Sequence, residues 1–349
     1  MTKEIITDDS QNENEELFER FLLKIDKGQE PLRIDKFLMN RIEGATRNKI
    51  QQAIAAKLVQ VNGKEIKANY KIKPLDEIIV FSDMSPEDTA VVPEKMNLNI
   101  TYEDDDLMII NKPAGMVVHP GSGNYKGTLL NGIAWHQQQH NLISEDSMPR
   151  FGLVHRIDKN TSGLLVIAKN DKALSHLAKQ FFDHTISRKY IALVWGDVKN
   201  DSGTINAHVG RHLRFRKQFA AFPDGDHGKE AITHYNVLER LGYVTLVECI
   251  LETGRTHQIR VHMKHLGHPL FNDEIYGGDR IVKGTVFAKY KQFVDNCFSI
   301  CARQALHAKT LGFLHPTIEK QVNFDSQMPK DLFDVIEKWR KYATTKSII

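Results

Sequence analysis

The chain has 349 residues, 41% of them hydrophobic and 26% charged, which is typical of a globular protein with one large core and a smaller second domain. No apolar run approaches the roughly 18 residues that span a bilayer. The acidic N-terminus also lacks the basic and then apolar pattern of a secretory signal, so we expect a cytoplasmic protein with no membrane partner. Its three cysteines, Cys249, Cys297 and Cys301, argue against a disulfide framework, and with His307 they follow no zinc-binding spacing.

The net charge of +3 is unevenly distributed along the chain. Residues 1–30 hold four Lys or Arg against nine Asp or Glu, whereas residues 31–73 hold ten against three. Residues 1–16 are acidic and almost without large apolar groups, so we expect a disordered tail. The basic density of residues 31–73 is what binding to a phosphate backbone requires. A solvated surface domain with no ligand is the alternative.

The elements after this tail predict a small domain over residues 17–83. Apolar residues at helical spacing predict one helix over residues 32–38 and a second over residues 46–57. Alternating valines predict a strand at residues 59–61, which Asn62-Gly63 would end in a type I′ turn. A closing strand is predicted at residues 77–81. The prolines and acidic residues that follow predict a linker over residues 84–95.

A second domain over residues 96–349 opens with strand candidates at 100–102 and 107–110. The glycine-rich stretch after them is not a dinucleotide loop, because Lys126 stands where G-x-G-x-x-G requires glycine. A phosphate loop of the G-x-x-x-x-G-K-[ST] type is absent from the sequence as well. We therefore expect no nucleotide cofactor.

The most informative stretch is GLVHRIDKNTSGLLVIAKN, residues 152–170. Turn-forming residues place Asp158 on a short loop directly before an apolar strand at residues 164–168, which is a rigid support of the kind that carries catalytic groups. An aspartate at such a place is more often a solvated turn residue. The crowding of His155, Arg156 and Lys159 around it favours a functional site.

The chain continues with a helix begun by Asn170-Asp171, whose aromatic residues Phe181 and Phe182 we expect in the core. Tyr190 stands at the head of a strand at residues 191–195, a position that is weak evidence for any role. Cations interleaved with aromatic residues over residues 208–231 suit either an RNA-gripping loop or a plain surface hairpin. Paired strands are predicted at residues 231–238 and 243–251.

A helix is predicted in ETGRTHQIRVHMKHLGH, residues 252–268, with Thr256 as N-cap and Gly267 at its end. Arg260 then lies in the first turn, where a cation opposes the helix dipole at a cost of about 0.3–1 kcal/mol. This position suggests that a nearby carboxylate compensates its charge. His262 and His265 lack the spacing and the carboxylate of a zinc helix. A strand pair near residues 305–316 and an amphipathic helix over residues 331–342 complete the chain.

The small domain resembles the RNA-binding module of the small-subunit ribosomal protein four type. LRIDKFL, TRNKIQQAI and LVQVNGKEIK carry the resemblance, with Lys57 where the pattern often has glycine at the helix end. In such modules the second helix and its edges present basic groups to RNA. The resemblance implies these phosphate contacts: Arg33, Lys36, Arg47, Lys49 and Lys64.

Four segments of the second domain together resemble the RluA/RluD-type family of pseudouridine synthases. They are NKPAGMVVHPG, HRIDKNTSGLLVIAK, RKYIALV, and LETGRTHQIRVH with the later ALHAKTLGFLHP. The family usually has leucine at the position of Ile157, a swap that preserves volume. The resemblance implies an α+β fold, in which a large catalytic domain has a central, mostly antiparallel mixed sheet flanked by helices. The small α+β domain at the N-terminal end would bind RNA.

The resemblance also implies roles for five residues. Asp158 matches the nucleophile that acts when the uracil is detached, turned and rejoined through C5. Arg260 matches its basic partner, and Tyr190 the ring that stacks on the flipped base and can carry a proton. Arg156 matches the residue that fills the gap left by the base, and Ile259 the apolar wall.

We accordingly expect a monomeric isomerase that needs no metal or cofactor and acts on large-subunit ribosomal RNA or a ribosomal particle. The basic module and the loop around Arg214 would hold the RNA. Two alternatives stay open. One is a base-cleaving glycosidase that pairs Asp158 with a second carboxylate, and the other is a catalytically silent RNA-binding or assembly protein.

Overall fold

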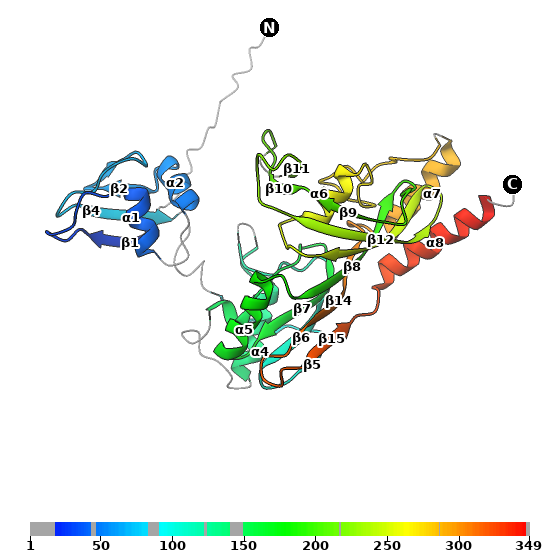
Figure 1. Cartoon of the computed structure of the whole chain (residues 1–349), viewed down its shortest axis with the longest axis horizontal. Helices are drawn as coiled ribbons and strands as arrows, with labels where there is room; N and C mark the ends of the chain where they lie inside the picture. Colours follow the sequence, from blue (N-terminus) through cyan, green and yellow to red (C-terminus); the bar gives the residue numbers. More distant parts are fainter. Residues whose placement is uncertain are drawn as a thin grey trace, which may run out of the picture. The chain divides into compact units, whose positions relative to one another are not determined.

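The structure is a computed structural model that describes residues 18–42, 47–82, 91–121, 124–139, 149–215, 218–285 and 287–346. It divides into two compact units, Met1–Ala90 and Val91–Ile349 (Figure 1). The predicted acidic tail at 1–16 and residues 84–90 of the predicted linker lie outside the described residues.

The small unit is two helices packed on a four-stranded antiparallel sheet. The helices are α1 (Ile34–Arg41) and α2 (Arg47–Ala55), and the sheet order is β1 (Phe18–Lys24), β4 (Glu77–Ser82), β2 (Val59–Val61) and β3 (Lys64–Glu65). Apolar residues of both helices and of β2 and β4 form one core, which confirms the predicted helical faces. Lys57 adopts the left-handed conformation, with φ of 63°, that the glycine of the related pattern would adopt freely.

The large unit is built on one mixed sheet in the order β5-β6-β7-β14-β8-β13-β12-β9, with β15 paired to β14. Among the pairings of the described strands, that of β7 with β14 is parallel and the others are antiparallel. The predicted fold class is therefore confirmed. The strands of the sheet are β5 (Ile100–Glu103), β6 (Leu107–Lys112), β7 (Ser162–Ala168), β8 (Ser187–Trp195), β9 (Ser202–Asn206), β12 (Ile232–Arg240), β13 (Val244–Leu251), β14 (Leu306–Leu314) and β15 (Gln321–Asp325).

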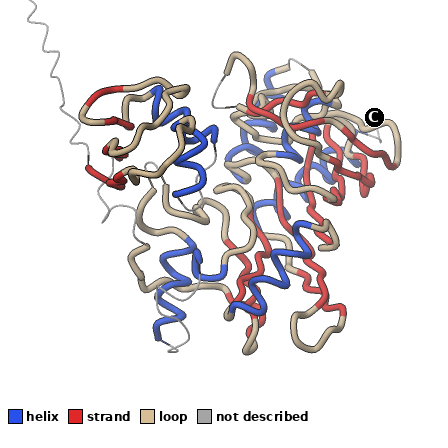
Figure 2. Tube along the Cα trace, turned by 60° about the vertical axis from the view of Figure 1, so that its left-hand side comes forward, coloured by secondary structure: helices blue, strands red, loops and turns tan. Residues whose placement is uncertain are grey.

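Helices pack against both faces of this sheet (Figure 2). They are α4 (Leu129–Gln139), α5 (Asp171–Phe182), α6 (Gln258–His265), α7 (Ala288–Ile300) and α8 (Lys330–Lys346). Alternate residues of β7 separate the faces, because Leu165 packs with α4 and Val166 with α5. Along β8, Tyr190 belongs to the core that includes α6, whereas Ile191 packs with α7 and α8. No described helix is both long and apolar enough to cross a membrane.

Three local predictions were wrong, and two of them concern residues near a helix end. The strand pair predicted near residues 305–316 is a single strand, β14, whose antiparallel partner β15 begins at Gln321. The N-cap of α6 is His257 rather than Thr256, because His257 takes a left-handed conformation with φ of 58° and the helix begins one residue later. Phe182 is 82% exposed at the last turn of α5, whereas the buried residues of that helix are Ala173, Leu177 and Gln180.

Candidate active site

A cleft of about 280 Å³ opens in the large unit beside the loop that precedes β7. Its walls come from that loop, the end of α5, the start of β8, the end of β13 and the start of α6. Five residues that the sequence singled out meet there, although up to 104 positions separate them in the chain: Arg156, Asp158, Tyr190, Ile259 and Arg260.

The loop that carries Asp158 is fixed by a buried lysine. Lys112, at the end of β6, is fully buried, and its Nζ donates hydrogen bonds of 2.7–3.0 Å to three backbone carbonyls, those of Pro113, Met116 and Lys159. Burial lowers the pKa of Lys112 to about 7, while the three acceptors favour its ammonium form. The lysine thus ties the residue directly after Asp158 to the loop that follows β6.

A second buried cation secures the other side of the same loop. Arg303 donates from Nη1 to the carbonyl of Asn160 at 3.0 Å and from Nη2 to Ser162 Oγ at 3.3 Å. Asp331 at the start of α8 accepts from the same guanidinium at 2.7 and 3.1 Å. Through these contacts, the position of Asp158 depends on the segment before β14 and on the start of α8.

The carboxylate of Asp158 accepts a hydrogen bond of 3.0 Å from Arg260 Nη1. Arg260 is itself held in a bidentate pair, with its Nε and Nη2 each 2.8 Å from an oxygen of Asp273. Burial disfavours the charge of Arg260, but the hydrogen bonds and charges of Asp273 and Asp158 outweigh it and raise its pKa. The arginine is therefore a permanent cation that orients Asp158, whose side chain is 20% exposed to the cleft.

Sequence reasoning missed Asp273, which is fully buried and accepts from the backbone N–H groups of Ile275 and Tyr276 as well. The signal that could have found it is Arg260 in the first turn of α6, which called for a compensating carboxylate. The structure supplies two. The ring of Tyr276 adds a cation–π contact, with its centroid 5.0 Å from the Arg260 guanidinium carbon.

His257 lines the cleft and was also not singled out from the sequence. Tyr276 Oη accepts from the backbone N–H of Phe219 at 3.2 Å and shares a hydrogen bond of 2.8 Å with His257 Nδ1. The other ring nitrogen of His257, Nε2, is 3.9 Å from Asp158 Oδ1. Burial lowers the pKa of His257, which keeps the ring neutral.

The remaining predicted cleft residues differ in exposure. Tyr190 and Ile259 are 8% and 4% exposed, and both belong to the core cluster that forms the apolar wall. Burial raises the pKa of Tyr190, so its hydroxyl stays protonated. Arg156 is exposed on the rim. Phe181 packs against the core cluster of β7 and α5, as expected, and it also lines the cleft, where it stacks on His155 with the ring centroids 4.5 Å apart.

Arg214 lies on the exposed loop of a hairpin formed by β10 (His208–Arg211) and β11 (Phe219–Phe222). Its neighbour Phe215 is 53% exposed, and the Arg214 guanidinium carbon is 5.7 Å from the centroid of that ring. The loop end of the hairpin reaches the active-site network, because Phe219, which pairs with Arg211 beside the loop, contacts both Tyr276 and the His257 ring. The surface hairpin of the sequence prediction is present, and it is joined to the cleft.

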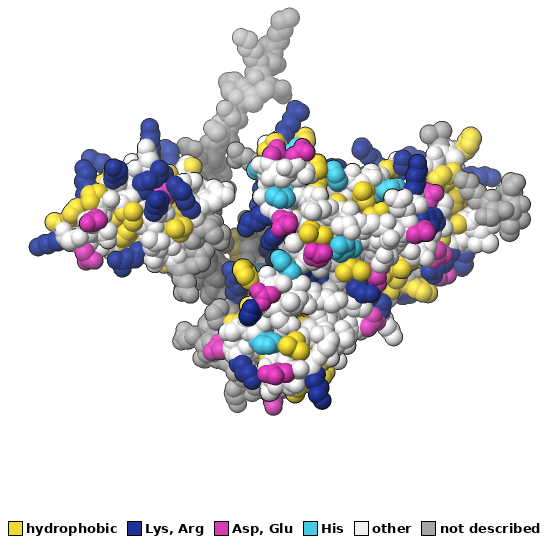
Figure 3. Space-filling model, in the orientation of Figure 1, with side chains coloured by type: hydrophobic (Ala, Val, Ile, Leu, Met, Phe, Trp, Pro, Cys, Tyr) yellow, Lys and Arg dark blue, Asp and Glu magenta, His cyan; other side chains and the backbone are white. Residues whose placement is uncertain are grey.

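In the small unit, two predicted RNA contacts share one buried partner. Asp35 is fully buried and accepts from Arg33 Nε and Nη2 at 3.1 and 2.9 Å, and from Arg47 Nε at 3.1 Å. The side chains of the two arginines are still 39% and 47% exposed. Lys36 and Lys64 are exposed, and the side chain of Lys49 lies outside the described part. Lys and Arg side chains gather on the visible face of this unit (Figure 3).

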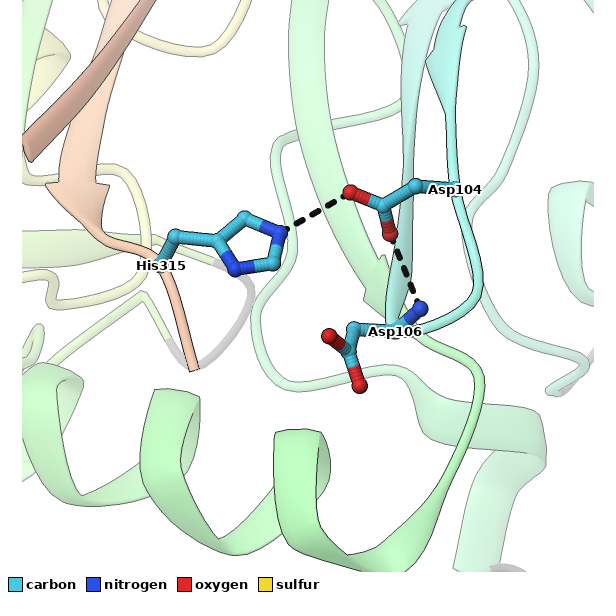
Figure 4. Close-up of side chains that lie close together, drawn as sticks. All are labelled: Asp104, Asp106 and His315. Atoms are coloured by element: carbon cyan, nitrogen blue, oxygen red, sulfur yellow. Dashed lines mark hydrogen bonds and ion pairs between the residues drawn. The ribbon is translucent and has the colours of Figure 1, made fainter. Parts of the chain in front are cut away.

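One group in the large unit has the composition of a metal site: Asp104, Asp106 and His315 (Figure 4). His315 Nδ1 faces the backbone N–H groups of Thr317 and Ile318 at 3.3 Å, so its proton lies on Nε2 and donates to Asp104 at 2.9 Å. The other oxygen of Asp104 accepts the backbone N–H of Asp106. With its donors and acceptors matched in this way, the group braces the turn between β5 and β6, and we assign no metal to it.

Each of the two units matches a known protein family. Residues 106–265 match the family model described as RNA pseudouridylate synthase, and residues 32–78 match that of the S4 domain. The solved structure of human RNA pseudouridylate synthase domain containing 4 is 21% identical and has the same fold, with a TM-score of 0.52. The similarity covers 69% of this chain and 93% of the human one.

Relatives of known sequence are closer. A Chlorobaculum parvum protein described as an uncharacterized RNA pseudouridine synthase is 46% identical, over 92% of this chain and 98% of its own. A Zymomonas mobilis protein named ribosomal large subunit pseudouridine synthase D is 41% identical, over 86% and 91%. The chain belongs to the family of RNA pseudouridine synthases. It is an isomerase that converts uridine in RNA to pseudouridine, as the sequence predicted.

Proposed function

We propose that the protein isomerises specific uridines of large-subunit ribosomal RNA, with Asp158 as the nucleophile. The observation that carries the assignment of Asp158 is its 3.0 Å hydrogen bond to Arg260 at the base of a cleft lined by Tyr190 and Ile259. Arg260 orients the carboxylate through one oxygen and leaves the other oxygen for the substrate. The names of several relatives, including that of Zymomonas mobilis, support ribosomal RNA as the substrate.

The other residues of the cleft have roles that follow from their exposure. Tyr190, whose hydroxyl stays protonated, is suited to stack on the flipped uracil and to hold or pass a proton beside it. Ile259 supplies the apolar surface against which the base packs. Arg156, exposed on the rim, is suited to enter the space that the extruded base leaves in the RNA.

In this proposal, residues 17–83 and the hairpin around Arg214 bind the RNA, and residues 96–349 carry out the isomerisation. The exposed guanidinium groups of Arg33 and Arg47, with Lys36 and Lys64, suit contacts to phosphates. The exposed Phe215 beside Arg214 suits stacking on an unpaired base. We propose that the enzyme acts as a monomer, on naked RNA or on a ribosomal particle.

The geometry disfavours the glycosidase alternative. The second carboxylate near Asp158 is Asp273, which is fully buried and bound through both oxygens to Arg260. Such a group can neither activate a water molecule nor protonate a leaving group, which are the tasks of the second carboxylate in a glycosidase.

The test is the pseudouridine content of large-subunit ribosomal RNA after incubation with the protein or with Asp158→Asn, read as carbodiimide adduct stops in primer extension. We expect new stops with the wild type and none with the variant, and RNA binding in both. Release of uracil would favour the glycosidase. Salt-sensitive binding without any modified product, on free RNA and on ribosomal subunits alike, would favour a silent binding protein.

A further inference from the structure

A second arginine, Arg188, lines the same cleft as Asp158 and Arg260. It stands two residues before Tyr190 on β8, so both side chains are on one face of the strand and about 6.6 Å apart along it. The residue is 7% exposed. Its guanidinium carbon is 5.5 Å from the centroid of the Phe181 ring, and its Nη2 donates to the carbonyl of Glu252 at 2.8 Å.

The charge of Arg188 is not compensated by the surrounding protein. No carboxylate oxygen of the described residues lies within 4.0 Å of its nitrogens, and its buried Nε has no hydrogen-bond partner among them. Burial lowers its pKa, as expected for a guanidinium removed from water without a counter-charge. A buried cation of this kind is costly to a fold, and it is a common feature of sites that receive a negative charge.

The neighbouring titratable groups do not supply that negative charge. His155 Nε2 accepts the backbone N–H of Val166 at 3.0 Å, and burial lowers the pKa of His155 to about 3, so the ring is neutral. Tyr190 also stays neutral, because burial raises its pKa. Arg260, by contrast, faces two carboxylates. The cleft therefore has one arginine that is paired with two carboxylates, Arg260, and one that has no carboxylate partner among the described residues, Arg188.

Pseudouridine formation creates a negative charge on the base. When the C1′–N1 bond breaks, its electron pair moves to the uracil, and C1′ is bound by an oxygen of Asp158. The charge of the detached base is delocalised over N1, O2 and O4. C5 then bonds to C1′, Asp158 is released as a carboxylate, and the loss of the C5 proton is balanced by protonation of N1. The base must also turn in the cleft before it is rejoined, so its charge has to be held in the meantime.

We propose that Arg188 is a catalytic residue that binds a carbonyl oxygen of the flipped uracil and stabilises the base as it becomes anionic. The inference rests on the proposed role of Asp158. A base stacked on Tyr190 reaches the guanidinium two residues along the strand. Burial favours the base over a phosphate, because the phosphates stay with the strand outside the cleft, near exposed cations such as Arg156.

Gly254, in the same cleft wall, is the positioning residue for Arg188. A Cβ added at Gly254 would lie 2.6 Å from Arg188 Nη1, so any larger residue displaces the guanidinium. This gives Gly254, which stands in the TGRTHQIR stretch, a function that its conformation alone does not require. Gly254→Ala should shift the guanidinium without removing its charge.

The test compares Arg188→Met, Arg188→Lys and Gly254→Ala with the wild type in single-turnover kinetics at saturating ribosomal RNA, alongside RNA affinity as a function of salt. We expect Arg188→Met to slow the single-turnover rate by about 10²–10³-fold, as loss of one donor to a developing anion does elsewhere. Affinity and its salt slope should stay unchanged. Arg188→Lys should restore part of the rate, and Gly254→Ala should lower it. Lys189→Met is the matched control, because Lys189 is on the opposite face of β8 and pairs with Glu248.

Two results would overturn the proposal. If Arg188→Met keeps the single-turnover rate but lowers affinity and reduces the salt slope by about 1, the residue is a phosphate contact. If rate and affinity are both unchanged in the folded variant, checked by circular dichroism, Arg188 is structural. A wild type that is inactive on every RNA would instead contradict the proposed function. A wild type that is active, with Asp158→Asn inactive and Arg188→Met normal, would contradict the role of Arg188 alone.

Discussion

The two units use the same pair of chemical groups in opposite proportions. In the small unit, one buried carboxylate, Asp35, is shared by two half-exposed arginines, Arg33 and Arg47. In the large unit, one buried arginine, Arg260, is shared by two carboxylates, and one of them faces the cleft. The first network has an excess of positive charge at the surface, and the second has an excess of negative charge inside a cleft.

In each network, one buried group holds two partners of opposite charge in fixed positions. The carboxylate of Asp35 holds two guanidinium groups in place, and each keeps donors for a phosphate. The guanidinium of Arg260 holds Asp158 in place while Asp273 and the Tyr276 ring support it from behind. In both networks the buried member orders the partly exposed member, which is the one that we propose to contact the RNA.

The largest expected effect comes from removing the shared arginine of the cleft. Arg260→Met leaves Asp273 buried without its partner, which should lower the free energy of unfolding of the large unit by about 3–5 kcal/mol. It should also reduce the single-turnover rate by about 10³-fold or more, because Asp158 loses its orientation and its counter-charge. Denaturant unfolding followed by fluorescence of the three tryptophans, all in the large unit, measures the first effect.

A double variant separates the two consequences. Asn at position 273 is neutral and keeps an acceptor for the backbone N–H groups that Asp273 now binds, so Arg260→Met with Asp273→Asn should regain much of the lost stability. Activity should not return, since Asp158 still lacks its partner. Recovery of activity in the double variant would mean that Arg260 acts on folding alone.

Several residues of these two networks and the buried faces of some helices could be predicted from the sequence. Asp158, Arg260 and Tyr190 were named from motifs that resemble a family, and the apolar spacing of the small-unit helices predicted their buried sides. The first-turn position of Arg260 even called for a carboxylate. Asp273 could not be chosen among the acidic residues, because its proximity to Arg260 depends on how the segment after α6 folds back.

Other features escaped for similar reasons. Strand β1 has no strong pattern of its own, and it is ordered by pairing along β4 from Phe18 to Lys24. The start of α6 depends on the left-handed backbone at His257, which the local sequence does not predict. The site at Arg188 depends on a close approach to Gly254 that joins β8 to the segment after β13. Each of these features comes from tertiary contacts rather than from local preference.

A smaller effect should distinguish the stabilities of the two units at acidic pH. Burial lowers the pKa of His155 to about 3 and of His307 to about 4, so the folded large unit stays unprotonated at these sites where the unfolded chain binds protons. Its free energy of unfolding should therefore fall as the pH drops from about 6.5 to 4, by up to about 3 kcal/mol for each histidine.

The small unit should behave differently over the same range. The hydrogen bonds from Arg33, which outweigh burial, hold the pKa of Asp35 well below its usual range. The stability that this provides is present above about pH 3.9 and is lost only as the pH falls further toward the folded-state pKa. Hydrogen exchange at pH 6.5 and 4.5, corrected for intrinsic rates, should show loss of protection in β7 but not in α1. A parallel loss in both units would contradict this account, and His307→Gln should reduce the acid effect in the large unit.

The smallest expected effect is a change in RNA affinity of the small unit, and the direction of that change is informative. Asp35→Asn and Asp26→Asn each remove one negative charge from the small unit, and Asp26 is exposed. If charge alone governed RNA binding, both variants would bind more tightly. Because Asp35 orders Arg33 and Arg47, we expect Asp35→Asn to weaken binding by roughly threefold to tenfold, which is about 0.7–1.4 kcal/mol. Asp26→Asn should strengthen it slightly. Fluorescence anisotropy with labelled ribosomal RNA at one salt concentration measures both, and tighter binding by Asp35→Asn would mean that the carboxylate merely neutralises the arginines it contacts.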